Sequence, residues 1–137
     1  MSRTILDAGA FIALDKTDPA MWKRFNTDIN AKRQLLTHAG IVGQVWRKPA
    51  IQARLATALR SVQIDPLSDE LAKTTGVLLA KTRTSDVHDG ALAAMCKEGD
   101  VLYTSDPEDL VDLLEALNQP GVRIVPPRSK AWSKPAV

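Results

Sequence analysis

Four aspartates lie where short apolar runs end or where a helix begins, and acids in such places can bind a metal ion. Asp7 directly follows the apolar run "TIL", and Asp106 lies just beyond "VLYT". Asp86 and Asp89 open a helical segment, and their i, i+3 spacing places them on one face of that helix. If these carboxylates converge, their mutual repulsion calls for a cation. Oxygen ligands of this kind select Mg²⁺ or Mn²⁺.

Helix capping is the alternative explanation for each acid taken alone. The motif "SDPE" (105–108) fits a capping box, and its Asp-Pro step is also a good pair of N-cap and first helical residue. Ser85 or Asp86 can cap a helix that begins near Val87. Capping explains Asp7 less well, because this residue stands between two apolar runs. Both explanations stay open.

Short apolar runs alternate with amphipathic segments, and this alternation predicts the elements that position the acids. Strands are expected at 4–6, 34–37, 61–64, 101–104 and 122–125. Helices are expected within 9–14, 19–30, 39–48, 49–61, 68–81, 85–99 (ending at Gly99) and 106–117. Such alternation is typical of an α/β fold with a largely parallel sheet that is covered on both faces. In such sheets, sites form beyond the carboxyl ends of the strands.

Length and composition limit the class of protein. The 137 residues suit one domain, expected over 1–126, followed by a basic, Pro-rich tail at 127–137. The net charge of +2 permits a polyanionic ligand but does not demand one. No apolar run approaches the roughly 18–20 residues that span a bilayer. Cys96 is the single cysteine, which is consistent with a reducing compartment and predicts a cytoplasmic protein without a membrane partner.

Other reactive residue types form weaker patterns. His38 and His88 are far apart and lack metal-ligand spacing, so His88 is expected to be a surface histidine. Cys96 lies about two helical turns after His88, which argues against a Cys-His pair. The sequence contains no Gly-rich phosphate-binding loop.

Four segments, taken in order, resemble a known pattern. "ILDAGAFIALD" is similar to the opening strand and helix of PIN-domain proteins of the VapC toxin type, with Asp7 as the first family acid. "TSDVHDGALAA" resembles their central motif, where Asp89 matches the family acid and Asp86 is a nearby extra. "VLYTSDPEDL" resembles the last motif, with Asp106 as the fourth acid. "IVGQVWRKP" matches the segment that usually supplies a Glu, and here that position holds Gln44.

The resemblance implies a three-layer α/β/α sandwich with a mostly parallel five-stranded sheet. It implies Mg²⁺- or Mn²⁺-dependent cleavage of RNA, with the cation held by Asp7, Asp89 and Asp106. Arg47 and Lys48 would position the RNA backbone. Such toxins are held inactive by a small antitoxin and commonly form homodimers.

Gln44 is the departure from this pattern, and it leaves two functions open. An amide oxygen can accept a hydrogen bond or ligate weakly, but it adds no negative charge to a site that attracts a dication. Gln44 is therefore expected to weaken metal binding, with Asp86 partly replacing the missing charge. The alternative is a PIN-like module that binds RNA or protein without cleavage. A phosphotransfer domain is a third class, but Gly9 stands where haloacid-dehalogenase-type enzymes need a second acid.

Overall fold

A single all-parallel sheet organises the chain. The computed structural model describes residues 3–83 and 86–126, and within them the five strands are ordered β3-β2-β1-β4-β5. The strands are β1 (Arg3–Leu6), β2 (Gln34–His38), β3 (Gln63–Asp65), β4 (Val101–Tyr103) and β5 (Arg123–Val125). Every pair of neighbouring strands is parallel, so all the carboxyl ends lie on one edge. The register pairs Leu6 with Tyr103, which places the segments after β1 and β4 side by side.

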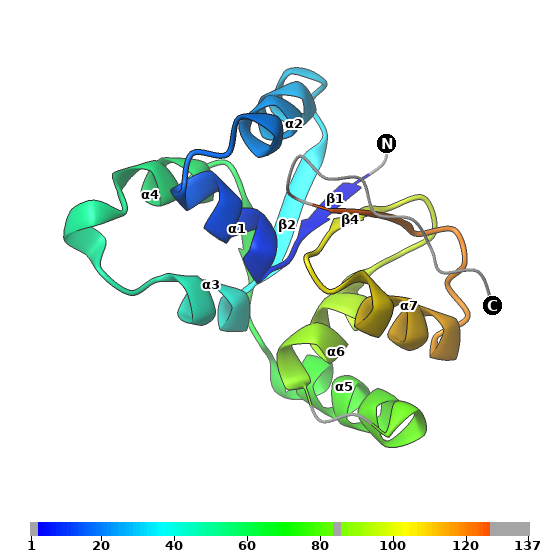
Figure 1. Ribbon diagram of the computed structural model, residues 1–137. Helices are drawn as coiled ribbons and strands as arrows, with labels where there is room; N and C mark the ends of the chain where they lie inside the picture. Colours follow the sequence, from blue (N-terminus) through cyan, green and yellow to red (C-terminus); the bar gives the residue numbers. More distant parts are fainter. Residues whose placement is uncertain (1–2, 84–85, 127–137) are drawn as a thin grey trace.

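Helices cover both faces of this sheet, which confirms the predicted three-layer α/β/α arrangement (Figure 1). The helices are α1 (Ala8–Asp15), α2 (Pro19–Asn30), α3 (Ala39–Val45), α4 (Ala53–Leu59), α5 (Asp69–Thr82), α6 (Val87–Met95) and α7 (Pro107–Ala116), with a short 3-10 helix η1 (Pro49–Ile51) between α3 and α4. On one side, α1 packs against α2, α3 and α4. On the other side, α5, α6 and α7 pack against one another.

The central strands are apolar because both of their faces are buried. Ile5 and Leu6 of β1 and Leu102 of β4 are fully buried, and they join one continuous core with Phe11 and Phe25 of the covering helices. Charged groups are buried as well, and Asp28 is the least exposed of the buried aspartates. The carboxylate of Asp28 is 2% exposed, and it accepts a hydrogen bond from Arg33 at 2.7 Å.

Two predicted helix ends are wrong. The helix expected to run to Gly99 ends at Met95, and Gly99 lies in the following turn with φ of 89° and donates its N–H to Gly121. The helix expected over 39–48 ends at Val45. Pro49 explains why Lys48 is not helical, because a proline disfavours the helical conformation of the residue before it.

The helix expected over 49–61 begins late, because Pro49–Ile51 form the 3-10 helix η1 and α4 starts at Ala53. The other element boundaries lie within about two residues of the predicted ones. The predicted tail, 127–137, lies outside the described residues. Among the described helices, none is both long enough and apolar enough to cross a lipid bilayer.

Candidate active site at the carboxyl edge of the sheet

Asp7 lies between β1 and α1, where the two central strands end. Its side chain is 3% exposed, and each of its two oxygens accepts one hydrogen bond. Oδ1 accepts from the backbone N–H of Ala8 at 2.6 Å, and Oδ2 accepts from the hydroxyl of Thr104 at 2.7 Å. Burial raises the pKa of Asp7, although these two hydrogen bonds favour its ionised form. Asp7 is therefore a fixed, buried carboxylate at the centre of the sheet edge.

Asp86 and Asp89 occupy the first turn of α6. Asp86 is the N-cap residue, as one of the two capping candidates predicted, and its Oδ1 accepts from the backbone N–H groups of both His88 and Asp89 at 3.0 and 3.1 Å. Ser85, the other candidate, lies outside the described residues. Asp86 is exposed, whereas Asp89 is only 8% exposed. The helix start thus places one acid at the surface and one inside.

The pKa of Asp89 is raised from 3.8 to about 8. Burial is the largest cause, and the charge of Asp7 is the next. The charges of Asp86 and Asp106 act in the same direction, and a hydrogen bond with Asp86 favours the protonated form of Asp89. Asp7 and Asp89 thus both feel the negative charges of Asp86 and Asp106, which come from neighbouring segments at this edge. A dication would relieve that repulsion.

Asp106 is the most open member of the group. It occupies the N-cap position of α7 with Pro107 as the first helical residue, yet its side chain makes no capping hydrogen bond. Its backbone N–H donates to the hydroxyl of Thr104 at 3.0 Å, so Thr104 connects the segment carrying Asp106 to the carboxylate of Asp7. The Asp106 side chain is exposed, and both of its oxygens are free of capping bonds.

The carboxylate oxygens of these four acids are suitable ligands for a hard dication, but the acids do not lie close enough together to hold one. Within residues 3–83 and 86–126, no three acidic, histidine or cysteine side chains lie close enough together to hold a metal ion as they stand. Ionised acids that repel one another are expected to separate when no cation lies between them. Asp7, Asp86, Asp89 and Asp106 are the residues that could hold one.

The other predicted site residues lie on α3 and the turn after it. Gln44 is exposed on α3, and its side chain makes no hydrogen bond to another residue that the structure describes. Arg47 and Lys48 are exposed and follow the end of α3, and both donate their backbone N–H groups to Gln52 Oε1 at 2.9 Å. Gln52 is 5% exposed and also donates to the carbonyl of Val45. Gln52 therefore fixes the turn that presents the two basic side chains.

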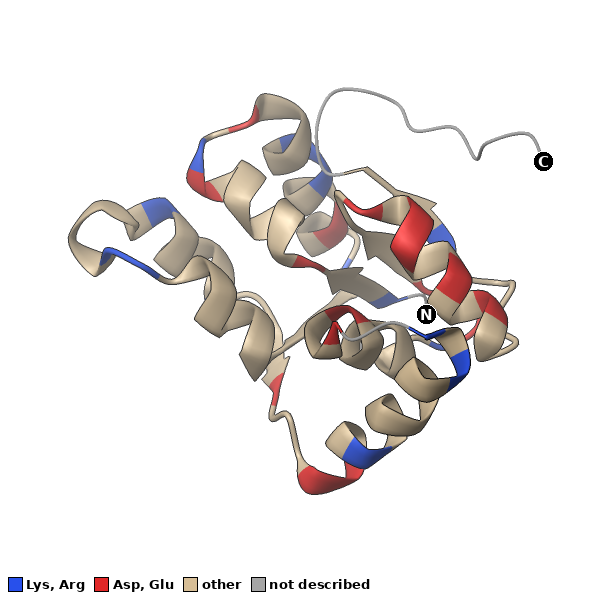
Figure 2. Ribbon diagram, turned by 60° about the horizontal axis from the view of Figure 1, so that its bottom comes forward, with Lys and Arg blue, Asp and Glu red and all other residues tan. Residues whose placement is uncertain are grey.

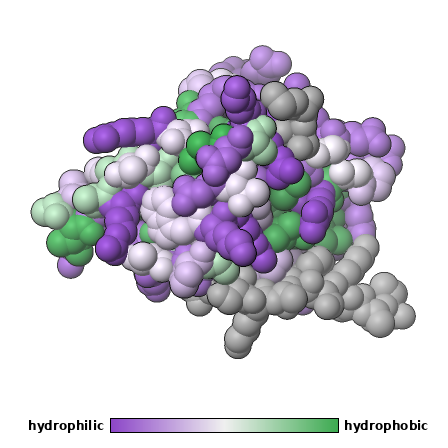
Figure 3. All heavy atoms as spheres, turned by 90° about the horizontal axis from the view of Figure 1, so that it is seen from above, coloured by the Kyte–Doolittle hydropathy of each residue, from purple (hydrophilic) through white to green (hydrophobic). Residues whose placement is uncertain are grey.

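This turn belongs to an arm formed by α3, η1 and α4, which projects to one side of the sheet (Figure 1). From Asp28 to Asp65 the chain has no other acid, and the arm carries blue but no red segments (Figure 2). The basic residues between those two acids are Lys32, Arg33, Arg47, Lys48, Arg54 and Arg60. The tip of the arm is apolar (Figure 3), and Ile51 is 75% exposed.

Sequence reasoning missed three contributors to this edge. Thr104 is fully buried between Asp7 and the Asp106 backbone, and a hydroxyl two residues before a helix start was the signal available for it. His38 and His88 stack with ring centroids 5.9 Å apart. His88 was predicted to be a surface residue, but it is half-buried and its Nδ1 is fully buried, because its ring packs on that of His38.

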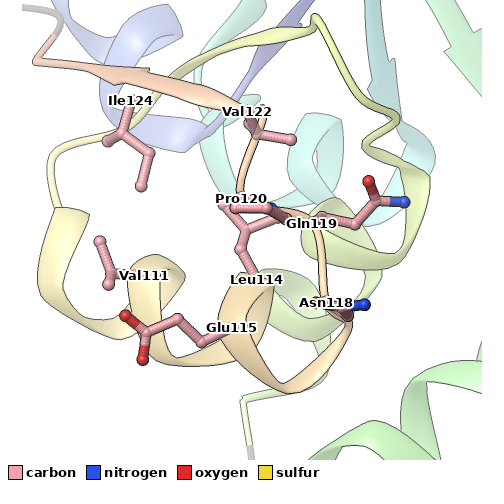
Figure 4. Close-up of a pocket in the computed structure, with 8 residues that line it drawn as sticks. All are labelled: Val111, Leu114, Glu115, Asn118, Gln119, Pro120, Val122 and Ile124. Carbon is pink, nitrogen blue, oxygen red and sulfur yellow. The ribbon is translucent and has the colours of Figure 1, made fainter.

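A groove of about 380 Å³ lies elsewhere, between the C-terminal half of α7 and β5. Its apolar side chains, including Val111, Leu114 and Ile124, point into the space shown in Figure 4. None of the four converging acids lines it. It is therefore separate from the candidate site.

The sequence matches no known protein-family model, and no curated protein matches it.

Proposed function

We propose that this protein is a metal-dependent endoribonuclease, a PIN-domain protein of the VapC type that acts as the toxin of a toxin–antitoxin pair. The observation that carries the proposal is the placement of Asp7, Asp86, Asp89 and Asp106 at the starts of α1, α6 and α7, with Asp7 and Asp106 following two neighbouring parallel strands. Burial and the neighbouring acids raise the pKa of Asp89 to about 8. Clustered carboxylates with raised pKa values are typical of functional sites. The order of the acids along the chain also supports the proposal, since it follows the PIN pattern.

The proposed cofactor is Mg²⁺ or Mn²⁺, bound by Asp7, Asp89 and Asp106 with Asp86 supplying additional charge. When bound, such an ion activates water and stabilises the charge that develops on the phosphate. Asp7 is already oriented for this role by Thr104 and Ala8. Asp89 would give up its proton when the cation arrives, because the positive charge reverses the effect of its acidic neighbours.

The proposed substrate is RNA, which the basic arm would hold by its phosphates. Arg47 and Lys48 are exposed on that arm, and no acid lies between Asp28 and Asp65 to oppose them. The side chain of Arg47 donates to the carbonyl of Gly43 at 2.8 Å, which directs it along α3. Contacts of this kind position a nucleic acid without reading its sequence. The proposed partners are a cognate antitoxin and a second copy of the chain, in the cytoplasm.

The test is cleavage of RNA by purified, antitoxin-free protein in parallel reactions with Mn²⁺, Mg²⁺ and chelator. We expect cleavage that requires a divalent cation and is lost in Asp7→Asn, which keeps the shape of the side chain and removes its charge. Asp112→Asn, at an exposed position of α7, is the matched control and should cleave normally. Metal-independent cleavage, or full activity of Asp7→Asn, would refute the proposal.

A second function is supported by Gln44, which brings no charge to the site and whose side chain makes no hydrogen bond to the described part of the chain. The protein would then be a PIN-like module that binds RNA or a protein without cleavage. Stoichiometric RNA binding with no cleavage under any divalent cation would favour this function. Cleavage that depends on the acids would exclude it.

A further inference from the structure

Two histidines join the end of β2 to the start of α6. His38 is fully buried at the end of β2, and His88 lies in the first turn of α6 between Asp86 and Asp89. The imidazole rings are nearly parallel, at 14°, with centroids 5.9 Å apart. His38 Nε2 lies 3.0 Å from the backbone carbonyl oxygen of His88. The contact spans 50 positions of sequence, so it joins two elements that lie far apart in the chain.

The hydrogen bonds of His38 define its protonation state. Its Nδ1 accepts from the backbone N–H of Gly40 at 3.1 Å, which requires a lone pair on that nitrogen. The single ring proton of a neutral imidazole is then on Nε2, which donates to the carbonyl of His88. Burial lowers the pKa of His38, which favours this neutral form. His38 thus caps α3 with one nitrogen and holds α6 with the other.

The held carbonyl belongs to the peptide unit that leads directly into Asp89. Fixing this peptide plane fixes the position from which the Asp89 side chain projects toward Asp7. The fit around the pair is tight, because a Cβ at Gly40 would lie 2.5 Å from His88 Nδ1 and 2.9 Å from His38 Cε1. Gly43, in the same helix, has nothing within 4 Å of its Cβ position. The absence of a side chain at Gly40 therefore permits the contact.

We propose that His38 is a positioning residue, which holds the first turn of α6 and the carboxylate of Asp89 against the end of β2. This inference adds a residue to the proposed metal site. Where Mn²⁺ binding is measured, the inference rests on the proposed function. Groups that orient metal ligands typically change metal affinity by ten- to a hundredfold when they are removed. His38 would orient the proposed metal ligand Asp89 through its backbone, by holding the carbonyl of the preceding residue.

Two substitutions separate the two bonds of His38. His38→Asn keeps an acceptor for the Gly40 N–H, and asparagine is a favoured N-cap, but its side chain is too short to reach the carbonyl of His88. His38→Gln can present an N–H near the place of Nε2 but loses the capping acceptor. We expect Asn to weaken Mn²⁺ binding about tenfold while keeping the fold, and Gln to keep the affinity within about twofold of wild type.

Gly40→Ala tests the same contact from the opposite side. Its methyl group would force the His88 ring away, so we expect a loss of Mn²⁺ affinity like that of His38→Asn. Gly43→Ala is the matched control in the same helix and should bind Mn²⁺ as wild type does. Folding of each variant is checked by amide NMR spectra, and Mn²⁺ affinity is measured by calorimetry.

A second readout separates this inference from the proposed function. Amide hydrogen exchange in the first turn of α6, where the N–H groups of His88 and Asp89 donate to Asp86, is followed by NMR without metal. Exchange should be faster than in wild type in His38→Asn and Gly40→Ala, but not in His38→Gln or Gly43→Ala. If wild type binds no Mn²⁺, the proposed function fails, and this exchange alone decides the role of His38. Wild-type exchange in both His38→Asn and Gly40→Ala would overturn the inference. Loss of affinity in His38→Gln equal to that in His38→Asn would also overturn it, since capping alone would then explain the effect.

Discussion

Replacing Asp89 with asparagine should change how the stability of the fold depends on pH. The pKa of Asp89 is raised to about 8, so between about pH 4 and pH 8 the folded protein keeps a proton that the unfolded chain has lost. The folded state then binds more protons than the unfolded state, and the free energy of unfolding falls as pH rises through this window. Asparagine does not titrate, so the free energy of unfolding of the variant should lack the decline with pH that Asp89 causes.

The raised pKa sets the size of the effect. A rise from 3.8 to about 8 corresponds to at most about 6 kcal/mol, at about 1.4 kcal/mol for each tenfold change in proton affinity. Two of the neighbours that contribute, Asp86 and Asp106, are exposed, and water screens their repulsion. We therefore expect the variant to match wild type near pH 4 and to be about 2 kcal/mol more stable at pH 9.

The assay is urea unfolding of wild type and Asp89→Asn at intervals from pH 4 to pH 9, with and without Mn²⁺. The comparison reports Asp89 together with its interaction with Asp7, because titrating groups elsewhere are common to both proteins. Asp112→Asn, an exposed acid on α7, should keep the wild-type dependence on pH. Saturating Mn²⁺ at pH 8 should stabilise wild type by about 2 to 3 kcal/mol at a hundred times the dissociation constant, and should stabilise Asp89→Asn much less. Parallel curves for wild type and Asp89→Asn over the whole range would refute the convergence of the acids.

Three further substitutions test separate parts of the molecule. Gln44→Glu should tighten Mn²⁺ binding about threefold in calorimetry, from the added charge; an unchanged affinity would place Gln44 outside the site. Gly9→Ala should lower stability in urea by about 1 to 3 kcal/mol, since its Cβ would meet the Ser105 side chain, 2.7 Å from Ser105 Cβ; a gain in stability would contradict this close approach. Arg33→Met should lower stability by about 3 kcal/mol near pH 7, because it leaves the Asp28 carboxylate buried without its cation; wild-type stability would contradict this role of the ion pair.

The sequence predicts the strands well because a buried parallel strand has little freedom in composition. β1 and β4 are buried on both faces, and their predicted ranges differ from the observed ones by one residue at an end. The order of the strands is harder to predict from the sequence, because it depends on pairings between distant segments. The convergence of Asp7 with Asp106 requires β1 and β4 to be neighbours, which the Leu6–Tyr103 register establishes.

Helix ends and buried polar contacts were harder to predict for a common reason. The end of α6 at Met95 rather than Gly99 depends on the turn that follows, where the backbone N–H of Lys97 donates to the carboxylate of Asp100. The contact of His38 with His88 joins residues 50 positions apart, and that of Thr104 with Asp7 joins residues 97 apart. Neither pair carries a local spacing signal. Only the folded arrangement brings these side chains together.

Capping and cation binding use different oxygen atoms, so the two explanations of the acids are not exclusive. An ionised carboxylate has about four acceptor positions, and Asp86 satisfies both of its capping bonds with Oδ1. Asp7 uses one position on each oxygen, and Asp106 uses none for capping. A capping bond also restricts the side chain before any ligand arrives, which lowers the entropy cost of binding. The same bonds that begin the helices therefore hold the carboxylates where a dication could reach them.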